Sequence, residues 1–500
     1  MPGDAAPIDH PVDNTPDLQV LLASQYPLIY AEARDEERLM AMVRRAATAA
    51  GAPVWTWSVT RGLARDGMEA QYQTQDPARA FDFVDATTGP GVFLFADVHH
   101  ALENPAVVRR IKEIAQRATP GRTVILAAPS RTIPPELEGL VLPWTLRPPG
   151  REEMVRLVQR TVDDLRRRRI PVYLEPGDAE RFADTLRGLS LPDAERLVQR
   201  AALDGGGLKG EDLALVRTAK AEILNVAGVL ELIEAEVGTL DQVGGLDGIK
   251  TWLERRRAAM EHPDAATLRL DAPRGVLLMG VPGCGKSLIA KSLARTWDLP
   301  LVLLDPARLY GSYIGESEQR LDRALRTVEA MAPTVLWIDE IEKGFASTDR
   351  GDGGVSRRLL GTFLRWMQDR GDGVFLVATA NDVASLPPEL LRKGRFDEIF
   401  FVDLPDDAAR RRILEIHLAR RGHDPAHCHR DAMVAATDGY SGAEIEAAVV
   451  GALYRVVGAG STLSDNELLA EIRGTVPLSV TRAEDIAALR AWAASRAQAA

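Results

Sequence analysis

The residues with the clearest chemistry form a glycine-rich loop in the second half of the chain. Residues 280–287 read G-V-P-G-C-G-K-S, directly after the apolar run 275–279 and directly before a helical pattern. In a strand–loop–helix setting, glycines let successive backbone N–H groups converge on phosphate oxygens, and the positive end of the helix dipole favours the same anion. This loop is therefore predicted to bind the phosphates of a nucleoside triphosphate.

Two side chains of the loop have separate predicted tasks. Lys286 reaches the β- and γ-phosphates, and Ser287 offers its hydroxyl to Mg²⁺, which keeps most of its waters and takes only one or two protein ligands beside the phosphates. The predicted nucleotide-binding residues of this segment are Val281, Pro282, Gly283, Cys284, Gly285, Lys286, Ser287 and Leu288.

A second motif lies about fifty residues further on, where the apolar run 335–338 ends in Asp339 and Glu340. In an open α/β sheet, ligands bind at the carboxyl ends of the strands, so these acids are expected to face the phosphates. We expect Asp339 to orient the water shell of Mg²⁺ and Glu340 to polarise the attacking water.

The chain that positions these motifs is longer than a single hydrophobic core normally accommodates. Five hundred residues predict two or more domains, and 46% hydrophobic with 27% charged residues is ordinary for a soluble globular protein. The 61 basic and 72 acidic residues leave a net charge of −11, which argues against nucleic acid as the main partner.

The sequence contains few cysteines and no recognisable targeting or membrane-spanning segment. The two cysteines, Cys284 and Cys428, suggest no disulfide framework. The first thirty residues hold no Lys or Arg and no apolar core of a secretory signal, and no run of about eighteen apolar residues occurs. We therefore expect a cytoplasmic protein that does not enter a membrane, with a disordered tail over residues 1–17.

Further motifs carry a family resemblance. The apolar run 374–380 ends at Asn381, and residues 387–397 read P-P-E-L-L-R-K-G-R-F-D. Together with the two nucleotide motifs, the chain from about Asp241 onward resembles the AAA family of ring-forming ATPases. The resemblance implies ATP and Mg²⁺ as cofactors and a homo-oligomeric ring, expected to be a hexamer. By the same likeness Asn381 is sensor 1, and Arg392 and Arg395 are arginine fingers that act in the neighbouring subunit's site.

The resemblance also implies where the base lies. Gly244 and Gly245 in V-G-G-L match the segment lining the adenine pocket, His417 in I-L-E-I-H-L matches a residue that contacts the nucleoside, and Gly442 and Ala443 open the lid helix. Because some relatives carry a sensor 2 arginine where this chain has Ala443, no γ-phosphate contact from the lid is expected.

Tyr313 and Ile314, within Y-G-S-Y-I-G, resemble a pore loop that grips extended polypeptide. The alternative is a loop aromatic that packs on its own domain.

The first half of the chain resembles a degenerate duplicate of the second. Residues 125–137 line up with 376–390, residues 91–98 with the strand before Glu340, and residues 188–195 with 439–444. The copy lacks the chemistry: residues 32–38 contain no glycine, and Val98 is predicted to stand in place of Glu340. The alternative is an unrelated α/β domain with chance matches. The whole arrangement resembles the Ycf46-like AAA proteins of cyanobacteria, plastids and other bacteria.

These observations predict an α/β fold, a P-loop (AAA) parallel sheet with a helical lid, preceded by a degenerate AAA-like α/β domain. The expected domains are a tail (1–17), a degenerate α/β domain (18–140), a lid-like helical subdomain (141–230), the ATPase large domain (231–405) and its helical lid (406–500).

Three functions are weighed. The leading one is ATP hydrolysis coupled to remodelling of an unknown protein client; a nucleotide-controlled assembly switch or scaffold is the alternative, and a nucleic-acid-associated ATPase is third because of the acidic composition. His423, His427, Cys428 and His429 form one metal-like cluster, which is left open as a zinc or copper site. Its setting in a linker after a helix and the lack of a second ligand group with matching spacing count against a metal site.

Overall fold

The computed structural model describes residues 15–130, 132–226, 228–233, 238–262, 271–309, 316–345, 354–423, 430–459 and 463–500. The chain folds as two compact units: the first runs to Arg160 and includes Leu189–Glu195, and the second comprises Thr161–Gly188 and Arg196–Ala500. The domain boundaries expected from the sequence stay predictions.

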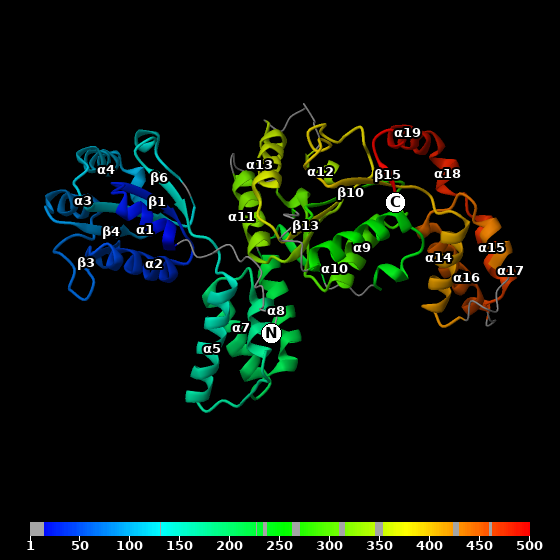
Figure 1. The fold of residues 1–500 in the computed structure, drawn as a ribbon, viewed down its shortest axis with the longest axis horizontal. Coiled ribbons are helices and arrows are strands. Elements are labelled where there is room, and N and C mark those ends of the chain that lie inside the picture. Colours follow the sequence, from blue (N-terminus) through cyan, green and yellow to red (C-terminus); the bar gives the residue numbers. More distant parts are fainter. Residues whose placement is uncertain are drawn as a thin grey trace. The chain divides into compact units, whose positions relative to one another are not determined.

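The first unit is built on a six-stranded sheet in the order β3-β2-β4-β5-β1-β6, parallel except for the edge strand β3. Two apolar clusters cover its faces, one against α1 and α2 and the other against α3 and α4 (Figure 1). Its elements are α1 (Thr15–Ala23), β1 (Leu28–Glu32), α2 (Glu36–Ala49), β2 (Val54–Ser58), β3 (Gly62–Arg65), α3 (Pro77–Ala86), β4 (Gly91–Phe95), α4 (Pro105–Arg117), β5 (Arg122–Ala128), β6 (Leu142–Thr145) and the start of α5 (Arg151–Arg167).

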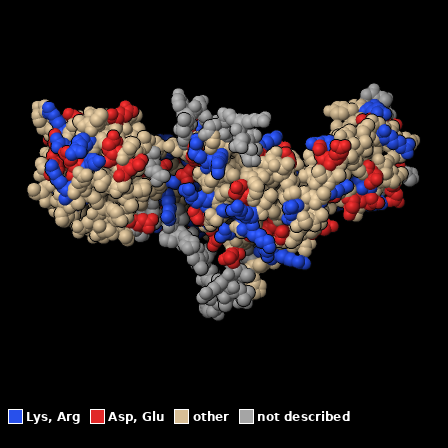
Figure 2. Space-filling model, turned by 90° about the horizontal axis from the view of Figure 1, so that it is seen from above, with Lys and Arg blue, Asp and Glu red and all other residues tan. Residues whose placement is uncertain are grey.

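The surface of this unit mixes both signs of charge. Figure 2 shows acidic and basic side chains interspersed over its visible face. Several form ion pairs, such as Arg110 with Asp82 at 2.7 Å and Arg44 with Asp66 at 2.7 Å.

A helical segment follows the first sheet. Its elements are β7 (Val172–Tyr173), α6 (Asp178–Leu186), α7 (Leu191–Asp204), β8 (Leu208–Lys209) and α8 (Leu213–Val226), with β7 and β8 paired in parallel.

The large domain of the second unit has a seven-stranded sheet in the order β15-β14-β10-β13-β12-β11-β9, in which only β9 is antiparallel to its neighbour. The central strands β10, β12 and β13 are buried along their whole length, as expected for a sheet covered on both faces. Its elements are β9 (Leu230–Ile233), α9 (Asp247–Glu261), β10 (Gly275–Gly280), α10 (Lys286–Trp297), β11 (Leu301–Leu304), α11 (Glu316–Ala330), β12 (Thr334–Ile338), α12 (Ile341–Phe345), α13 (Val355–Asp369), β13 (Val374–Ala380) and β14 (Glu398–Val402).

A helical lid follows β14 and has its own apolar core. Its helices are α14 (Asp407–Ala419), α15 (Arg430–Ala436), α16 (Gly442–Ala459), α17 (Asp465–Gly474), α18 (Leu478–Thr481) and α19 (Ala483–Ala493). No helix in the described part of the chain combines the length and the apolar character that crossing a bilayer requires.

After α19 the chain returns to the large domain. The short strand β15 (Gln498–Ala499) pairs in parallel with β14, and the Gln498 side chain donates a hydrogen bond to Glu398 at 2.7 Å. Arg490 of α19 binds Asp403, directly after β14, through two nitrogens at 2.8 to 3.1 Å. The lid is therefore joined to the large domain at both of its ends.

The two large sheets share a plan. The first sheet reads β6-β1-β5-β4-β2-β3, and the second reads β14-β10-β13-β12-β11-β9 once β15 is set aside. Strands at the same place in the two orders correspond, and in both sheets the last strand, β3 or β9, is an antiparallel edge strand. The registers agree as well, because Phe95 pairs with Leu126 where Ile338 pairs with Ala378. The prediction of a P-loop α/β domain preceded by an AAA-like α/β domain is confirmed.

Candidate functional site

The glycine-rich loop joins β10 to α10 at the edge of the sheet where the parallel strands end. Gly283 and Gly285 have φ of +76° and +94°, conformations that residues with a Cβ rarely adopt. The loop therefore turns tightly enough to bring its backbone to the start of α10, whose first residue is Lys286.

Lys286 is buried within this loop. Its ammonium donates hydrogen bonds to the carbonyls of Gly280 and Val281, each at 2.9 Å. Burial lowers the pKa of this lysine to about 8, although nearby acidic groups act in the opposite direction. In this arrangement the lysine is folded onto its own loop, at the position from which it can reach a phosphate.

Ser287 and Asp339 come together across the sheet edge. The Ser287 hydroxyl donates to Oδ1 of Asp339 at 3.0 Å, and Thr379 of β13 donates to the same oxygen at 2.5 Å. A hydroxyl and a carboxylate are hard oxygen donors that suit Mg²⁺. Among the described residues no group of three or more His, Cys, Asp or Glu side chains is placed to hold a metal alone.

Glu340 follows Asp339 with a left-handed backbone, at φ of +49°. The Asn381 amide donates to Oε1 of Glu340 at 2.7 Å, and Lys343 forms an ion pair with Oε2. Both oxygens of this carboxylate are therefore engaged by neighbouring side chains. The predicted residues Glu340 and Asn381, which are 41 positions apart, lie in direct contact.

Glu342, which was not among the residues predicted from the sequence, binds the backbone of Asn381. It is buried, and its Oε1 accepts the backbone N–H of Asn381 at 2.9 Å. Burial raises the pKa of the Glu342 carboxyl group. This side chain helps to hold the end of β13 against α12.

The residues predicted to surround the base are also brought together. A Cβ added to Gly244 would lie 2.7 Å from Ile413 of α14, and one added to Gly245 would lie 2.7 Å from Ala409. At the start of α16, the backbone N–H of Ala443 donates to the carbonyl of Gly283 at 3.0 Å. The lid thus contacts the glycine-rich loop and the Gly244–Gly245 segment. Leu288, on the first turn of α10, packs on the core of the large domain.

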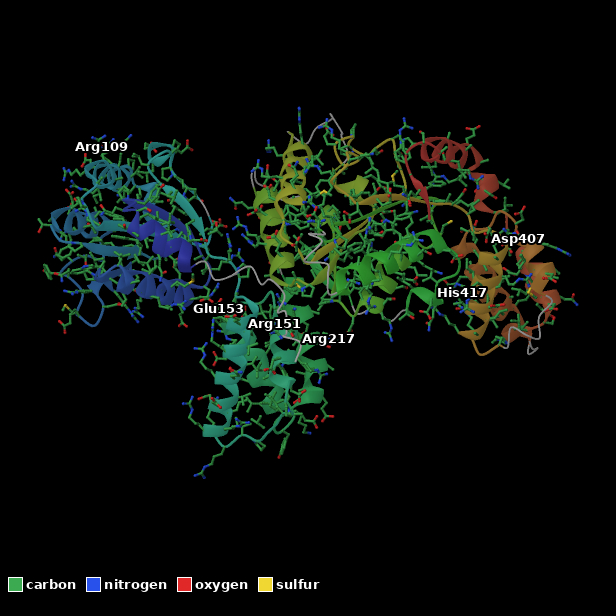
Figure 3. All side chains as sticks on the ribbon, viewed as in Figure 1. Arg109, Arg151, Glu153, Arg217, Asp407 and His417 are labelled. Carbon is green, nitrogen blue, oxygen red and sulfur yellow. The ribbon has the colours of Figure 1, made fainter. Side chains whose placement is uncertain are left out.

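His417 contacts other residues of the lid. Figure 3 shows it on α14, the helix that begins at Asp407. Its Nδ1 lies 3.4 Å from Glu446 and 3.3 Å from Arg421, and burial lowers its pKa. These partners all belong to the lid, and the role of His417 toward a nucleoside stays a prediction.

The two predicted arginine fingers lie after β13, on the segment that leads into β14. Arg392 is exposed, whereas Arg395 is half-buried and donates to the carbonyl of Leu364 at 2.5 Å. Their action on a neighbouring subunit stays a prediction.

Tyr313 and Ile314 lie outside the described residues, as do His427, Cys428 and His429 of the proposed metal cluster. His423 is described, and its backbone N–H donates to the carbonyl of Leu418 at 3.1 Å.

The first unit carries different residues at the equivalent positions. Only residues 33–35 separate β1 from α2, compared with 281–285 between β10 and α10. The shared register places Ala96 where the second sheet has Asp339, and Asp97 where it has Glu340. Asp97 even shares the left-handed backbone, at φ of +50°. The prediction that Val98 replaces Glu340 is wrong by one residue, because the strand ends at Phe95.

An ion pair lies where the second unit has apolar residues. Arg38 is the third residue of α2, as Leu288 is of α10, and Glu153 is the third residue of α5, as Ala409 is of α14. The Arg38 guanidinium binds both oxygens of Glu153 at 2.7 and 3.3 Å, and the two side chains are only 5% and 12% exposed. In the described part of the first unit, therefore, the connection from β1 to α2 has no glycine-rich loop, and an ion pair joins α2 to α5.

Comparisons with known proteins agree with this architecture. The model of the "ATPase family associated with various cellular activities (AAA)" matches residues 276–404, and two models of SpoVK-like AAA ATPases, the N-terminal and second domains, match residues 15–145 and 152–226. The chain is 32% identical to the uncharacterized AAA domain-containing protein ycf46 of Guillardia theta, over 96% of this chain and 94% of that protein. The ycf46 protein of Trieres chinensis is 30% identical over 96% of both chains. The proteasome-activating nucleotidase of Pyrococcus horikoshii is 35% identical over 43% of this chain and 56% of its own length. The chain therefore belongs to the AAA family of ATPases, and within it to the Ycf46-like AAA domain-containing proteins.

Proposed function

We propose that this protein hydrolyses ATP in a Mg²⁺-dependent reaction at the site between the large domain and the lid. The observation that carries the proposal is the meeting of Ser287, Asp339, Glu340 and Asn381 at one edge of the sheet, beside Lys286. These residue types supply a phosphate-binding cation, oxygen donors for Mg²⁺ and a carboxylate for the attacking water.

Each side chain has a distinct role in the proposal. Lys286 turns from its two loop carbonyls to the β- and γ-phosphates. Ser287 and Asp339 would hold Mg²⁺, which would supply positive charge beside the phosphates. Glu340 accepts a proton from the attacking water, while the Asn381 amide orients that water or the γ-phosphate. Because exposed ion pairs are weak, release of Glu340 from Lys343 presents a small barrier.

The wider function is proposed on the family. Arg392 and Arg395 would complete the site of an adjacent subunit in a homo-oligomeric ring, expected to be a hexamer, in the cytoplasm. Tyr313 and Ile314 would contact a protein client. The name of one relative records a nucleotidase that activates the proteasome, which supports coupling of hydrolysis to work on another protein. We further propose one nucleotide per chain, because in the described part of the first unit the connection between β1 and α2 is only residues 33–35, without a glycine-rich loop, and the Arg38–Glu153 ion pair joins the helices α2 and α5.

The test compares wild type with Glu340→Gln and Lys286→Ala in ATPase assays, with particle size measured in the same samples. We expect Glu340→Gln to bind one ATP per chain without hydrolysis and to retain an enlarged assembly with a specific protein from native lysate. Lys286→Ala should fail to bind. A wild type without ATPase activity would refute the proposal.

Remodelling and switching are separated by Tyr313→Ala. A remodeller loses client processing but keeps basal hydrolysis, whereas an assembly switch is indifferent to this change.

A further inference from the structure

Two polar side chains at and just after the end of β13, Thr379 and Asn381, face the two acids that follow β12. Thr379 and Asn381 are two residues apart, so they project to the same face of the extended chain. The register pairs Ile338 with Ala378, so Thr379 lies beside the point where β12 ends and Asp339 begins. Thr379 is only 1% exposed, which makes its hydroxyl a buried polar group with a defined environment.

Both hydrogen-bonding functions of this hydroxyl are used on the two acids. Oγ1 of Thr379 donates to Oδ1 of Asp339 at 2.5 Å and accepts the backbone N–H of Glu340 at 2.9 Å. Ser287 donates to the same Asp339 oxygen at 3.0 Å. One hydroxyl therefore fixes the carboxylate of the first acid and the peptide of the second.

The first unit shows that the left-handed turn after the strand does not depend on this hydroxyl. In the shared register, Ala127 of β5 stands where β13 has Thr379, and Asp97 stands where β12 is followed by Glu340. Asp97 nevertheless has φ of +50°, against +49° for Glu340. The left-handed turn thus forms without a hydroxyl. The first unit lacks both the hydroxyl and the carboxylate to which Thr379 donates in the second unit, because Ala127 replaces Thr379 and Ala96 replaces Asp339.

We propose that Thr379 is a positioning residue for the nucleotide site, which orients the Asp339 carboxylate toward Mg²⁺ and anchors the peptide of Glu340. The proposal rests on the proposed ATPase function and assigns Thr379 no contact with nucleotide. Supporting residues of this kind set the orientation of metal-binding groups, and their loss typically costs about 10- to 100-fold in activity or metal affinity.

The test compares Thr379→Val, which keeps the shape but removes the hydroxyl, with Thr379→Ser, which restores it. Thr334→Val is the matched control, because Thr334 is equally buried at the opposite end of β12 and donates only to the Pro300 carbonyl, at 2.9 Å. Each variant is assayed for kcat, KM for ATP and the Mg²⁺ concentration that gives half-maximal rate.

We expect Thr379→Val to lower kcat by about 10-fold or more and to raise the Mg²⁺ requirement, with KM for ATP changed by less than about 3-fold. Thr379→Ser should return both quantities close to wild type, and Thr334→Val should leave them unchanged. Equal activity of Thr379→Val and wild type, a Thr379→Ser variant as impaired as Thr379→Val, or a change in KM alone would overturn the inference. If Thr379→Val does not fold, Thr379→Ala replaces it with the same expectations, since the first unit tolerates alanine at the matching position.

A failure of the proposed function would be seen separately. If wild type does not hydrolyse ATP, the same variants are compared by the Mg²⁺ dependence of binding of a fluorescent, non-hydrolysable ATP analogue. The same order of variants then supports the role of Thr379, and an unchanged Mg²⁺ dependence overturns it.

Discussion

The buried ion pair between Arg38 and Glu153 predicts a large loss of stability when one partner is removed. Glu153→Ala leaves the Arg38 guanidinium buried, with the Arg147 carbonyl as its remaining acceptor. Removing one member of a buried pair typically costs about 3–5 kcal/mol. Because that carbonyl still accepts one hydrogen bond, we expect about 3 kcal/mol, which corresponds to a fall of roughly 6–12 °C in the unfolding temperature of a unit of this size.

The same helix supplies a matched control. Arg44 of α2 also binds a carboxylate through two nitrogens, at 2.7 and 3.0 Å, but its pair with Asp66 has side chains that are 53% and 35% exposed. Exposed pairs contribute about 0.2–1 kcal/mol. Asp66→Ala should therefore cost much less than Glu153→Ala, although both remove a two-point contact to α2.

Hydrogen exchange measured by mass spectrometry in increasing denaturant is the assay, because amides of β1 and β5, paired at the centre of the first sheet, report the unfolding of this unit alone. Equal losses for the two variants would refute the reasoning. A second check is the double replacement of Arg38 by Met and Glu153 by Leu, which should recover most of the loss, since apolar pairs of similar volume often replace buried ion pairs without cost.

Three further predictions follow from buried groups. Because burial lowers the pKa of Lys286 to about 8 and phosphate binding requires its charged form, ATP affinity should fall by up to about tenfold per pH unit above pH 8, with proton uptake visible in calorimetry; a flat pH profile would contradict this. Cys284, whose pKa burial raises to about 12, should react with iodoacetamide at pH 8 roughly 100- to 1000-fold more slowly than an ordinary thiol, as peptide mass spectrometry can show. Lys220 donates to the Thr185 carbonyl at 2.8 Å, and burial lowers its pKa to about 7 from 10.5. The unfolded chain therefore binds more protons between pH 7 and 10.5, so stability against urea should rise over that window, and Lys220→Met should flatten the rise.

The sequence predicted those parts of the site that depend on local chemistry. The glycine-rich loop and the acids after an apolar run are contiguous motifs, and their strand and helix boundaries follow from the same residues. Glu340 was assigned from its own motif and Asn381 through the family resemblance, and their contact followed from the parallel neighbours β12 and β13.

The remaining residues depend on register and could not be assigned in advance. Thr379 and Glu342 act through contacts between neighbouring elements, and only the two-residue spacing from Thr379 to Asn381 could have suggested the first of them. The one-residue error at Val98 arose because similarity of apolar runs does not locate the residue at which a strand ends. His417 is held by Glu446, which lies 29 positions away on another lid helix, a pairing that its own sequence context does not reveal.

The attachment of β15 to β14 has a mechanical consequence for the lid. A domain joined by a single linker can rotate in any direction. Here the lid is joined to the large domain by two connections at one edge of the sheet: the chain after β14, and the returning strand β15 together with the Arg490–Asp403 ion pair. We therefore expect nucleotide-driven motion of the lid to be mainly a rotation about the line through these two connections.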